Sequence, residues 1–141
     1  MIASGMVQVG TVRVLVVDDS VVVRNRLVTL LSELAGVDVV GTASDVPEGV
    51  AVARRLVPDA VVLDVRMPGG DGVAVLEDIK ARAPETVVVI LTNYTGERHR
   101  ARCIAAGADH FLDKSVNLDR LVDIFEDLAS AARRGGEDAP L

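Results

Sequence analysis

The sequence predicts a doubly wound α/β fold, in which helices cover both faces of a parallel sheet. Segments with strand character alternate with segments of helical periodicity from one end of the chain to the other. The strand segments, such as 12–17 and 60–63, are continuous apolar runs, which are typical of parallel strands buried on both faces. Charged residues directly follow several of these runs, and the carboxyl ends of parallel strands meet in one crevice.

In the first half of the chain, three strands alternate with two helices. The strands are predicted at 12–17, 37–41 and 60–63. Ser20 is a predicted N-cap of the first helix, which Gly36 is expected to end. Asp45 and Glu48 have the spacing of a capping box, so the second helix is expected to begin there and to reach about Leu56.

The second half opens with a turn over 67–72, which is rich in proline and glycine. Helices are expected at 73–83 and 97–106, and strands at 86–91 and 110–112. The last helix is predicted from apolar residues that share one helical face: Leu118, Leu121, Val122, Phe125, Leu128 and Ala129.

Length and composition indicate one domain and narrow the possible functions. The 141 residues are 50% hydrophobic but only 2% aromatic, so the core must consist mainly of aliphatic side chains. A net charge of −6 argues against nucleic-acid binding through a broad basic face. The single cysteine, Cys103, excludes an internal disulfide and suits a reducing cytoplasm. No signal peptide or apolar run long enough for a membrane span is present, so we expect a cytoplasmic protein without membrane contact.

Charged residues at three predicted strand ends mark a candidate site. Asp18 and Asp19 follow the first strand, Asp64 follows the third, and Lys114 follows the last. Carboxylates gathered in one crevice repel each other unless a cation binds, and Mg²⁺ prefers such oxygen ligands. A carboxylate standing apart from the pair, as Asp64 does, can act as a nucleophile and form an aspartyl phosphate.

Four motifs occur at these positions: LVVDDS at 15–20, LDVRMP at 63–68, ILT at 90–92 and GADHFLDK at 107–114. With them the chain resembles the receiver domain of bacterial two-component response regulators, and the resemblance extends from Val12 to about Arg133. It implies a five-stranded flavodoxin-like (βα)5 sheet with strand order 2-1-3-4-5. It also implies a receiver domain over 12–134, between an N-terminal extension (1–11) and a flexible tail (135–141).

The resemblance implies a role for each matching residue. Asp64 would accept a phosphoryl group from a histidine kinase or phosphotransfer protein, and Thr92 and Lys114 would contact it. A switch aromatic, Phe111, would turn inward when Thr92 moves toward the phosphate. Mg²⁺ would be held by three carboxylates and one backbone carbonyl, those of Asp18, Asp19, Asp64 and Arg66.

The expected output is a change in protein–protein binding rather than turnover of a substrate, so we expect a signalling switch and not an enzyme. No output domain follows the last helix, which suggests a stand-alone regulator whose downstream target is unknown. The predicted fourth helix is basic and the fifth acidic. These charges fit solvated helix faces as well as a homodimer formed through the two helices. Val22, which lies off the apolar stripe of the first helix, is the expected contact for the kinase.

Two positions depart from the family pattern. Ser115 replaces the usual proline after the lysine, and since a cis bond before serine costs about 2.5–4 kcal/mol, a trans Lys114–Ser115 bond is expected. Asn93 replaces a small residue, and with Arg66 and Tyr94 it could narrow the access of water to the phosphoryl group.

Two other functions fit parts of the sequence. A degenerate receiver could act as a phosphorylation-independent interaction module, although the full acidic set argues against it. A Mg²⁺-dependent phosphatase or a flavin protein could have a similar fold. The chain, however, has Arg66 where aspartate-based phosphatases have a second acid, and no glycine-rich phosphate loop follows the first strand.

Overall fold

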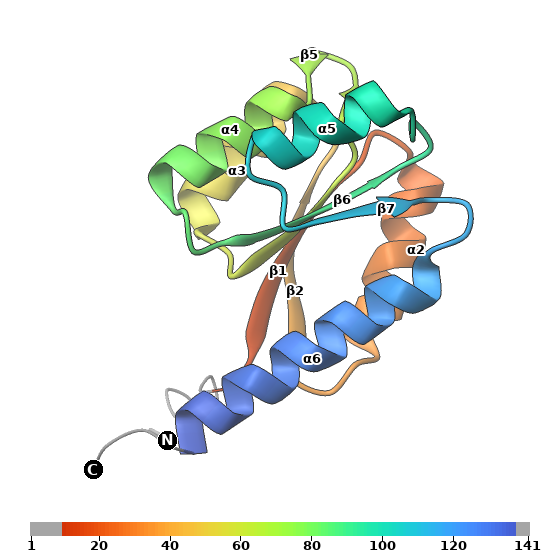
Figure 1. The fold of residues 1–141 in the computed structure, drawn as a ribbon. Coiled ribbons are helices and arrows are strands. Elements are labelled where there is room, and N and C mark those ends of the chain that lie inside the picture. Colours follow the sequence, from red (N-terminus) through yellow and green to blue (C-terminus); the bar gives the residue numbers. More distant parts are fainter. Residues whose placement is uncertain (1–9, 138–141) are drawn as a thin grey trace.

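The computed structural model describes residues 10–137, in which a five-stranded parallel sheet lies between two layers of helices (Figure 1). The strands of this sheet are β1 (Val12–Val17), β2 (Val37–Ala43), β3 (Ala60–Leu63), β6 (Val87–Thr92) and β7 (His110–Asp113). They are arranged in the order β2-β1-β3-β6-β7 and paired in parallel. Strands β6 and β7 are the fourth and fifth strands of this sheet along the chain. The order is therefore the predicted 2-1-3-4-5, and the predicted fold class is confirmed.

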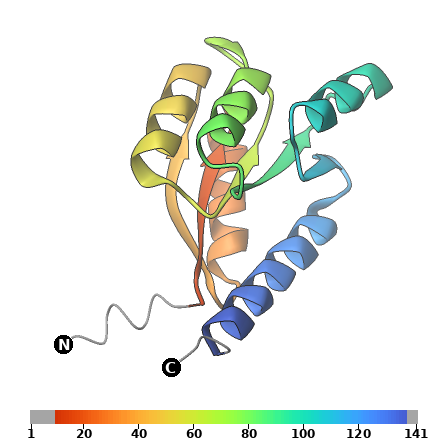
Figure 2. The same cartoon turned by 60° about the vertical axis from the view of Figure 1, so that its left-hand side comes forward.

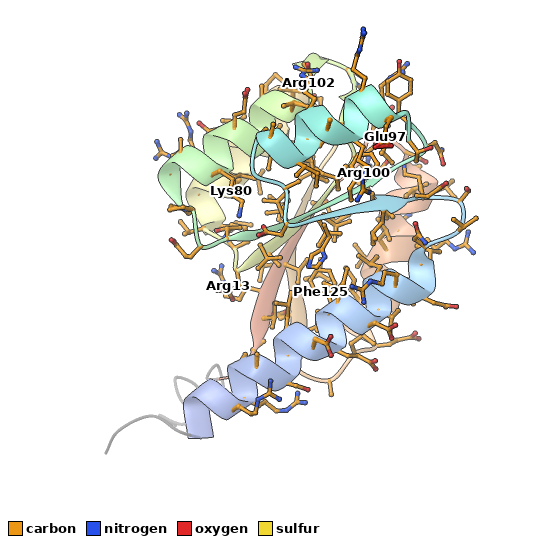
Figure 3. The ribbon with its side chains drawn as sticks, in the orientation of Figure 1. Arg13, Lys80, Glu97, Arg100, Arg102 and Phe125 are labelled. Atoms are coloured by element: carbon orange, nitrogen blue, oxygen red, sulfur yellow. The ribbon has the colours of Figure 1, made fainter. Side chains whose placement is uncertain are left out.

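Each face of the sheet is covered by its own set of helices (Figure 2). Helices α2 (Val21–Ser32) and α6 (Leu118–Glu137) cover one face, and α3 (Val46–Leu56), α4 (Val73–Arg82) and α5 (Glu97–Ala105) cover the other. Successive residues of β1 point to opposite faces, so Val16 packs in the α2–α6 core and Val17 in the α3–α4 core. Phe125 of α6 is fully buried under the sheet (Figure 3).

The predicted beginnings of the first two helices are confirmed. The Ser20 hydroxyl accepts a hydrogen bond from the N–H of Val23 at 3.2 Å, and the Asp45 carboxylate accepts one from the N–H of Glu48 at 2.8 Å. In return, the Glu48 carboxylate accepts from the N–H of Ser44 at 2.6 Å, one residue earlier than in a standard capping box.

Several predicted element ends were wrong. The second strand was expected to end at Gly41 but continues to Ala43, because β1 pairs with it as far as Val17–Ala43. Helix α2 ends at Ser32, before Gly36, because residues 34–36 form the turn into β2 and the positive φ of Gly36 (79°) belongs to that turn. Helix α6 continues to Glu137, so the first three residues of the expected tail, 135–137, are helical. The rest of that tail, 138–141, and residues 1–9 of the expected extension lie outside the described residues.

The predicted turn over 67–72 contains an additional two-stranded element. Strands β4 (Arg66–Met67) and β5 (Gly70–Asp71) pair in an antiparallel hairpin directly after Asp64. Gly69 and Gly70 both have positive φ, 89° and 132°, which permits the tight reversal between the two strands.

Among residues 10–137, no helix is both long and apolar enough for a membrane crossing.

Candidate functional site

The site residues are placed by the ladder of the parallel sheet. The N–H of Asp64 donates to the carbonyl of Val17 at 2.9 Å, and the N–H of Lys114 donates to the carbonyl of Thr92 at 2.9 Å. The N–H of Asp18 likewise donates to a carbonyl of β2 at 3.0 Å. Each of these residues extends the pairing by one step beyond its strand, so their side chains emerge at the same edge of the sheet.

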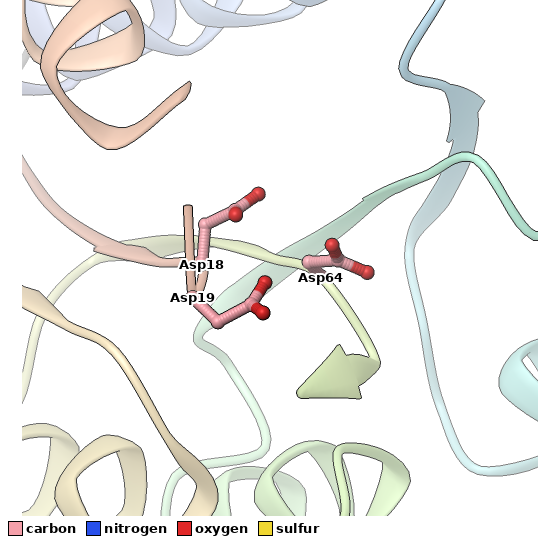
Figure 4. Close-up of side chains that lie close together, drawn as sticks. All are labelled: Asp18, Asp19 and Asp64. Atoms are coloured by element: carbon pink, nitrogen blue, oxygen red, sulfur yellow. The ribbon is translucent and has the colours of Figure 1, made fainter. Parts of the chain in front are cut away.

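Three carboxylates meet at this edge (Figure 4). One oxygen each from Asp18, Asp19 and Asp64 lies within 4.8 Å of the other two. Asp18 and Asp64 are buried, with 1% and 6% exposure, whereas Asp19 is open to solvent. The cluster is therefore a set of oxygen donors with one side facing water.

Lys114 completes the cluster. Its Nζ lies 2.7 Å from Oδ2 of Asp18 and 2.7 Å from Oδ2 of Asp64. Burial alone lowers the pKa of the Lys114 ammonium, but the hydrogen bonds to both carboxylates outweigh this effect, so its pKa is raised. The structure thus brings together the four charged side chains that the sequence placed at separate strand ends, and keeps the lysine charged.

Backbone N–H groups orient the two buried carboxylates. Oδ1 of Asp18 accepts from the N–H of Ser20 at 2.9 Å, and Oδ1 of Asp64 accepts from the N–H of Arg66 at 3.0 Å. Each carboxylate is held through one oxygen by the loop that follows it and through the other by Lys114. The Asp64 loop is also the one that contains Arg66, whose carbonyl was predicted to bind the metal.

A hollow of about 500 Å³ opens above the cluster. It is lined by Asp19, Ser20, Val23, Asp64, Arg66, Thr92, Asn93, Tyr94 and Lys114. Thr92 lies on its wall, and the Thr92 hydroxyl oxygen accepts from the N–H of Tyr94 at 3.1 Å, which leaves the hydroxyl proton available for donation. Most of the residues that line the hollow are polar, and it is large enough to admit a phosphoryl group together with water.

Phe111 does not line this hollow. It is half-buried against the α3–α4 side of the core, with its ring centroid 6.0 Å from that of His99. The guanidinium carbon of Arg100 lies 5.6 Å from the centre of the Phe111 ring. Phe111 is therefore in contact with helix α5, and its role as a switch stays a prediction.

The sequence reasoning missed how Arg66, Tyr94 and His99 are arranged. The guanidinium carbon of Arg66 lies 4.2 Å from the centre of the Tyr94 ring. The Tyr94 ring meets the His99 ring edge-on, and the two ring centroids are 4.8 Å apart. His99 lies between the rings of Tyr94 and Phe111. These residues come from a strand, a loop and a helix, so no periodic signal links them in the sequence.

The loop after Lys114 keeps a defined shape without proline. Oδ1 of Asp113 accepts from both the N–H and the hydroxyl of Ser115, at 2.9 and 2.6 Å, and Asn117 Oδ1 accepts from the N–H of Asp113 at 2.8 Å. The peptide bonds of the described residues are all trans, so the predicted trans Lys114–Ser115 bond is confirmed.

Comparison with known protein families matches residues 14–126 to the response regulator receiver domain. Because this match covers most of the chain, the chain belongs to that family. The resemblance found in the sequence motifs is thereby confirmed.

The curated relatives are longer proteins. A protein-glutamate methylesterase/protein-glutamine glutaminase of Hahella chejuensis is 43% identical over 106 residues, which are 74% of this chain and 27% of the relative. The DNA-binding transcriptional activator DevR/DosR of Mycobacterium tuberculosis is 38% identical over 119 residues, 84% of this chain and 55% of the relative. The chain thus spans about a quarter to about half of the length of these relatives.

Solved structures support the same assignment. The receiver domain of the putative response regulator NarL of Mycobacterium tuberculosis is 31% identical, with a TM-score of 0.77, over 85% of this chain and 97% of that one. The response regulator domain of Thermotoga maritima CheB is 30% identical, with a TM-score of 0.71, over 92% and 99% of the two chains.

Proposed function

We propose that Asp64 accepts a phosphoryl group and that the phosphorylated chain signals by a change in protein–protein binding. One observation carries this proposal: the Asp64 carboxylate lines a hollow, clusters with two further carboxylates and has a lysine ammonium 2.7 Å away. The carboxylates supply a nucleophile and a cation site, and the ammonium supplies positive charge for phosphoryl oxygens.

The phosphoryl donor is a histidine kinase or phosphotransfer protein. A carboxylate oxygen of Asp64 attacks the phosphorus of the donor's phosphohistidine, an O–P bond forms, and the N–P bond breaks with its electron pair leaving on the imidazole. Lys114 and the Thr92 hydroxyl contact the transferred phosphoryl oxygens. Attack of water on phosphorus later breaks the O–P bond, releases inorganic phosphate and returns Asp64 to its free carboxylate.

The donor set fits Mg²⁺, which is hard and prefers oxygen ligands and water. Asp18, Asp19 and Asp64 would hold it together with the backbone carbonyl of Arg66, and exposed Asp19 leaves room for bound water. When bound, the ion supplies charge that offsets the repulsion between the carboxylates and an incoming phosphoryl group. Lys114 and the N–H of Arg66 position the two carboxylate oxygens of Asp64.

Acetyl phosphate in the presence of Mg²⁺ tests the acceptor directly. We expect the intact mass of the wild type to increase by one phosphoryl group, and Asp64→Asn to remain unmodified. Asp123→Asn, which changes an exposed aspartate on α6, serves as a matched control and should be phosphorylated like the wild type. Equal modification of wild type and Asp64→Asn would contradict the proposal.

The start of α2 and the loop after Lys114 present a surface to the phosphoryl donor. Val21, Val22 and Val116 are large apolar residues with 55%, 71% and 70% exposure. They lie next in sequence to the segments around Ser20 and Lys114, which line the hollow. Val22→Glu should slow phosphotransfer from the kinase but leave modification by acetyl phosphate unchanged, because the small donor needs no docking surface.

We also propose that the chain forms a homodimer through the basic helix α5 and the acidic helix α6. Arg98 and Arg100 are exposed on α5, and Asp119, Asp123, Glu126 and Asp127 are exposed on α6. Opposite charges on two helices suit an interface in which the same patch is used by both subunits. Sedimentation with and without beryllofluoride, at low and high salt, should show dimers that weaken with salt.

The alternative of a phosphorylation-independent module depends on the departures at Ser115 and Asn93. The Asp113–Ser115 hydrogen bonds form the loop without proline, and Lys114 still reaches both aspartates. This favours the phosphoacceptor function. A pull-down with and without beryllofluoride would identify the downstream target and show whether its binding requires the Asp64 modification. Stand-alone action, a purely non-enzymatic output and cytoplasmic location stay predictions.

A further inference from the structure

The hairpin that follows the phosphoacceptor is in direct contact with the site. The N–H of Arg66 donates to Oδ1 of Asp64, and Arg66 is paired across the hairpin with Asp71. Because this pairing links the two backbones, a displacement of Asp71 is expected to displace the Arg66 backbone as well. Asp71 therefore has an indirect influence on the carbonyl that is proposed to bind the metal.

Helix α5 is weakly anchored to the rest of the protein. Within Glu97–Ala105, Cys103 is the buried residue, and the other side chains are mostly polar and exposed. A hollow of about 290 Å³ lies between this helix and the hairpin, lined by Val65, Arg66, Met67, Gly70, Asp71, Tyr94, His99 and Arg102. Apolar packing across this gap is therefore limited, and the polar contacts that cross it gain importance.

Two contacts cross the gap. The Arg102 guanidinium forms an ion pair with the Asp71 carboxylate, and His99, one helical turn away on the same face of α5, meets the Tyr94 ring that stacks on Arg66. In Figures 1 and 3, Arg102 lies on the side of α5 that faces β5. Helix α5 thus contacts β5 directly through Arg102 and reaches β4 through the Tyr94 ring.

The Asp71 carboxylate is held in one orientation. Its Oδ1 accepts from the N–H of Val73 at 2.9 Å, at the beginning of α4, while Oδ2 accepts from Arg102. Burial raises the pKa of Asp71, but the bonds from Val73 and Arg102 outweigh this, so the pKa is lowered and the group is ionised at neutral pH.

We infer that Arg102, acting through Asp71, positions the hairpin that carries the Arg66 carbonyl, and so couples helix α5 to the metal and phosphoryl site. The inference rests on the proposed function of Asp64. Arg102 is a positioning residue: it touches the hairpin and not the reacting atoms. By linkage, an ion at the site must then affect α5 as strongly as Arg102 affects the binding of that ion.

Mg²⁺ titration of four proteins tests this coupling: wild type, Arg102→Gln, Asp71→Asn and the double variant. Asparagine keeps an oxygen that can accept from Val73, so Asp71→Asn removes the charge and leaves the start of α4 intact. Tyr94 is the only tyrosine and the chain has no tryptophan, so intrinsic fluorescence reports on the ring next to Arg66. Titration calorimetry provides a second readout.

We expect each single variant to weaken Mg²⁺ binding about two- to fivefold, as befits a partly exposed ion pair. The double variant should bind no more weakly than either single variant, because both remove the same interaction. Arg102→Lys should recover part of the affinity. Arg98→Gln, the same charge change on the same exposed helix, should bind like the wild type. The difference between wild type and Arg102→Gln should vanish at about 1 M salt, since screening removes from the wild type the ion pair that the variant already lacks.

Hydrogen exchange supplies the reciprocal measurement. Mg²⁺ with beryllofluoride should slow amide exchange in α5 of the wild type, and this slowing should be lost in Arg102→Gln. Unchanged Mg²⁺ affinity in the single variants, strictly additive losses, or a loss that persists at high salt would each overturn the inference. If the variants still take a phosphoryl group from acetyl phosphate in that case, the function of Asp64 stands and only the coupling fails. A wild type that binds no Mg²⁺ would overturn both.

Discussion

Lysine occurs at only two positions in this arginine-rich chain, Lys80 and Lys114. The ammonium group of each lies between two or more oxygen acceptors. Lys114 reaches two carboxylates. Nζ of Lys80 donates to the carbonyls of Pro84 and Thr86, at 3.3 and 2.6 Å, and to Asp109 at 2.8 Å. Acceptors that converge on one point suit the compact ammonium of lysine and not the planar, forked guanidinium, so arginine would not replace lysine at either position.

Lys80→Arg is therefore expected to lower the free energy of unfolding by about 1–2 kcal/mol, since bonds to a charged group are lost. Urea denaturation would measure the change. Arg82→Lys, on the same helix and exposed, is the matched control and should be nearly neutral. A neutral Lys80→Arg would mean that the ammonium geometry is not required.

Asn93 is exposed on the wall of the site hollow, beside the Arg66–Tyr94 stack. We expect Asn93→Ala to shorten the lifetime of phosphorylated Asp64 about two- to fivefold, because a smaller side chain opens the path of water to phosphorus. Decay of the phosphorylated protein after removal of acetyl phosphate would show it. Asn25→Ala on the exposed face of α2 should leave the lifetime unchanged, and equal lifetimes in all three proteins would refute the role of Asn93.

At the scale of elements, the hairpin β4–β5 requires a glycine at its junction with α4. A Cβ added to Gly72 would lie 2.5 Å from Cα of Val65 and 2.6 Å from its carbonyl oxygen, both of them backbone atoms next to Asp64. Gly72→Ala should therefore destabilise the fold by roughly 1–3 kcal/mol and slow phosphorylation of Asp64.

Thermal unfolding and acetyl phosphate modification would test Gly72→Ala together. Gly96→Ala provides the control at the start of α5, where nothing lies within 4 Å of the added Cβ. That variant should be neutral or slightly stabilising. Equal stability of the two variants would show that the backbone near Val65 yields at little cost.

An ion pair between Arg54 and Asp78 joins helices α3 and α4, with Nη2 of Arg54 2.5 Å from Oδ1 of Asp78. The hydrogen bond from Arg54 lowers the pKa of Asp78, with burial opposing it. A carboxylate with a lowered folded-state pKa contributes stability above its unfolded pKa, near about 4, and loses it as pH falls through the folded value.

Arg54→Gln should therefore be less stable than wild type at pH 7, and the difference should shrink as pH falls below about 4. Chemical denaturation across this range is the measurement. Arg55→Gln, the neighbouring exposed arginine, should show no such pH-dependent difference. A difference that stays constant down to low pH would rule out Asp78 as its source.

At the scale of the whole molecule, the proposed cation site forms only in the folded protein, where β1 pairs with β3. Asp18 and Asp64 are 46 residues apart in sequence and become neighbours because β1 pairs with β3. Mg²⁺ should therefore stabilise the native state, by about 2.7 kcal/mol at a free concentration 100 times the dissociation constant. The rise in unfolding temperature should be reduced in Asp19→Asn and retained in Asp123→Asn. The same rise in Asp19→Asn would place the ion elsewhere.

The strands and the charged site were predictable because their signals are local. An apolar run identifies a buried strand, and a charge directly after it must emerge at the carboxyl edge. The sequence therefore predicts that Asp18, Asp64 and Lys114 lie together, as they do. The ends of α2 and α6 were less predictable. A glycine marks a turn as readily as a helix end, and the continuation of α6 through 135–137 includes two glycines.

The sequence alone determined the order of the helices and of the strands of the main sheet, the fold class and the acidic cluster with its lysine, because each depends on residue type within a short segment. Only the tertiary structure decided which side chains face each other across elements. The Asp71–Arg102 pair, the Arg54–Asp78 pair and the contacts of His99 join residues from different elements, in an arrangement set by how helices pack on the sheet. Such contacts give no periodic signal in the sequence. The spacing of apolar residues indicates which positions are exposed, but it does not indicate which exposed polar residues contact each other.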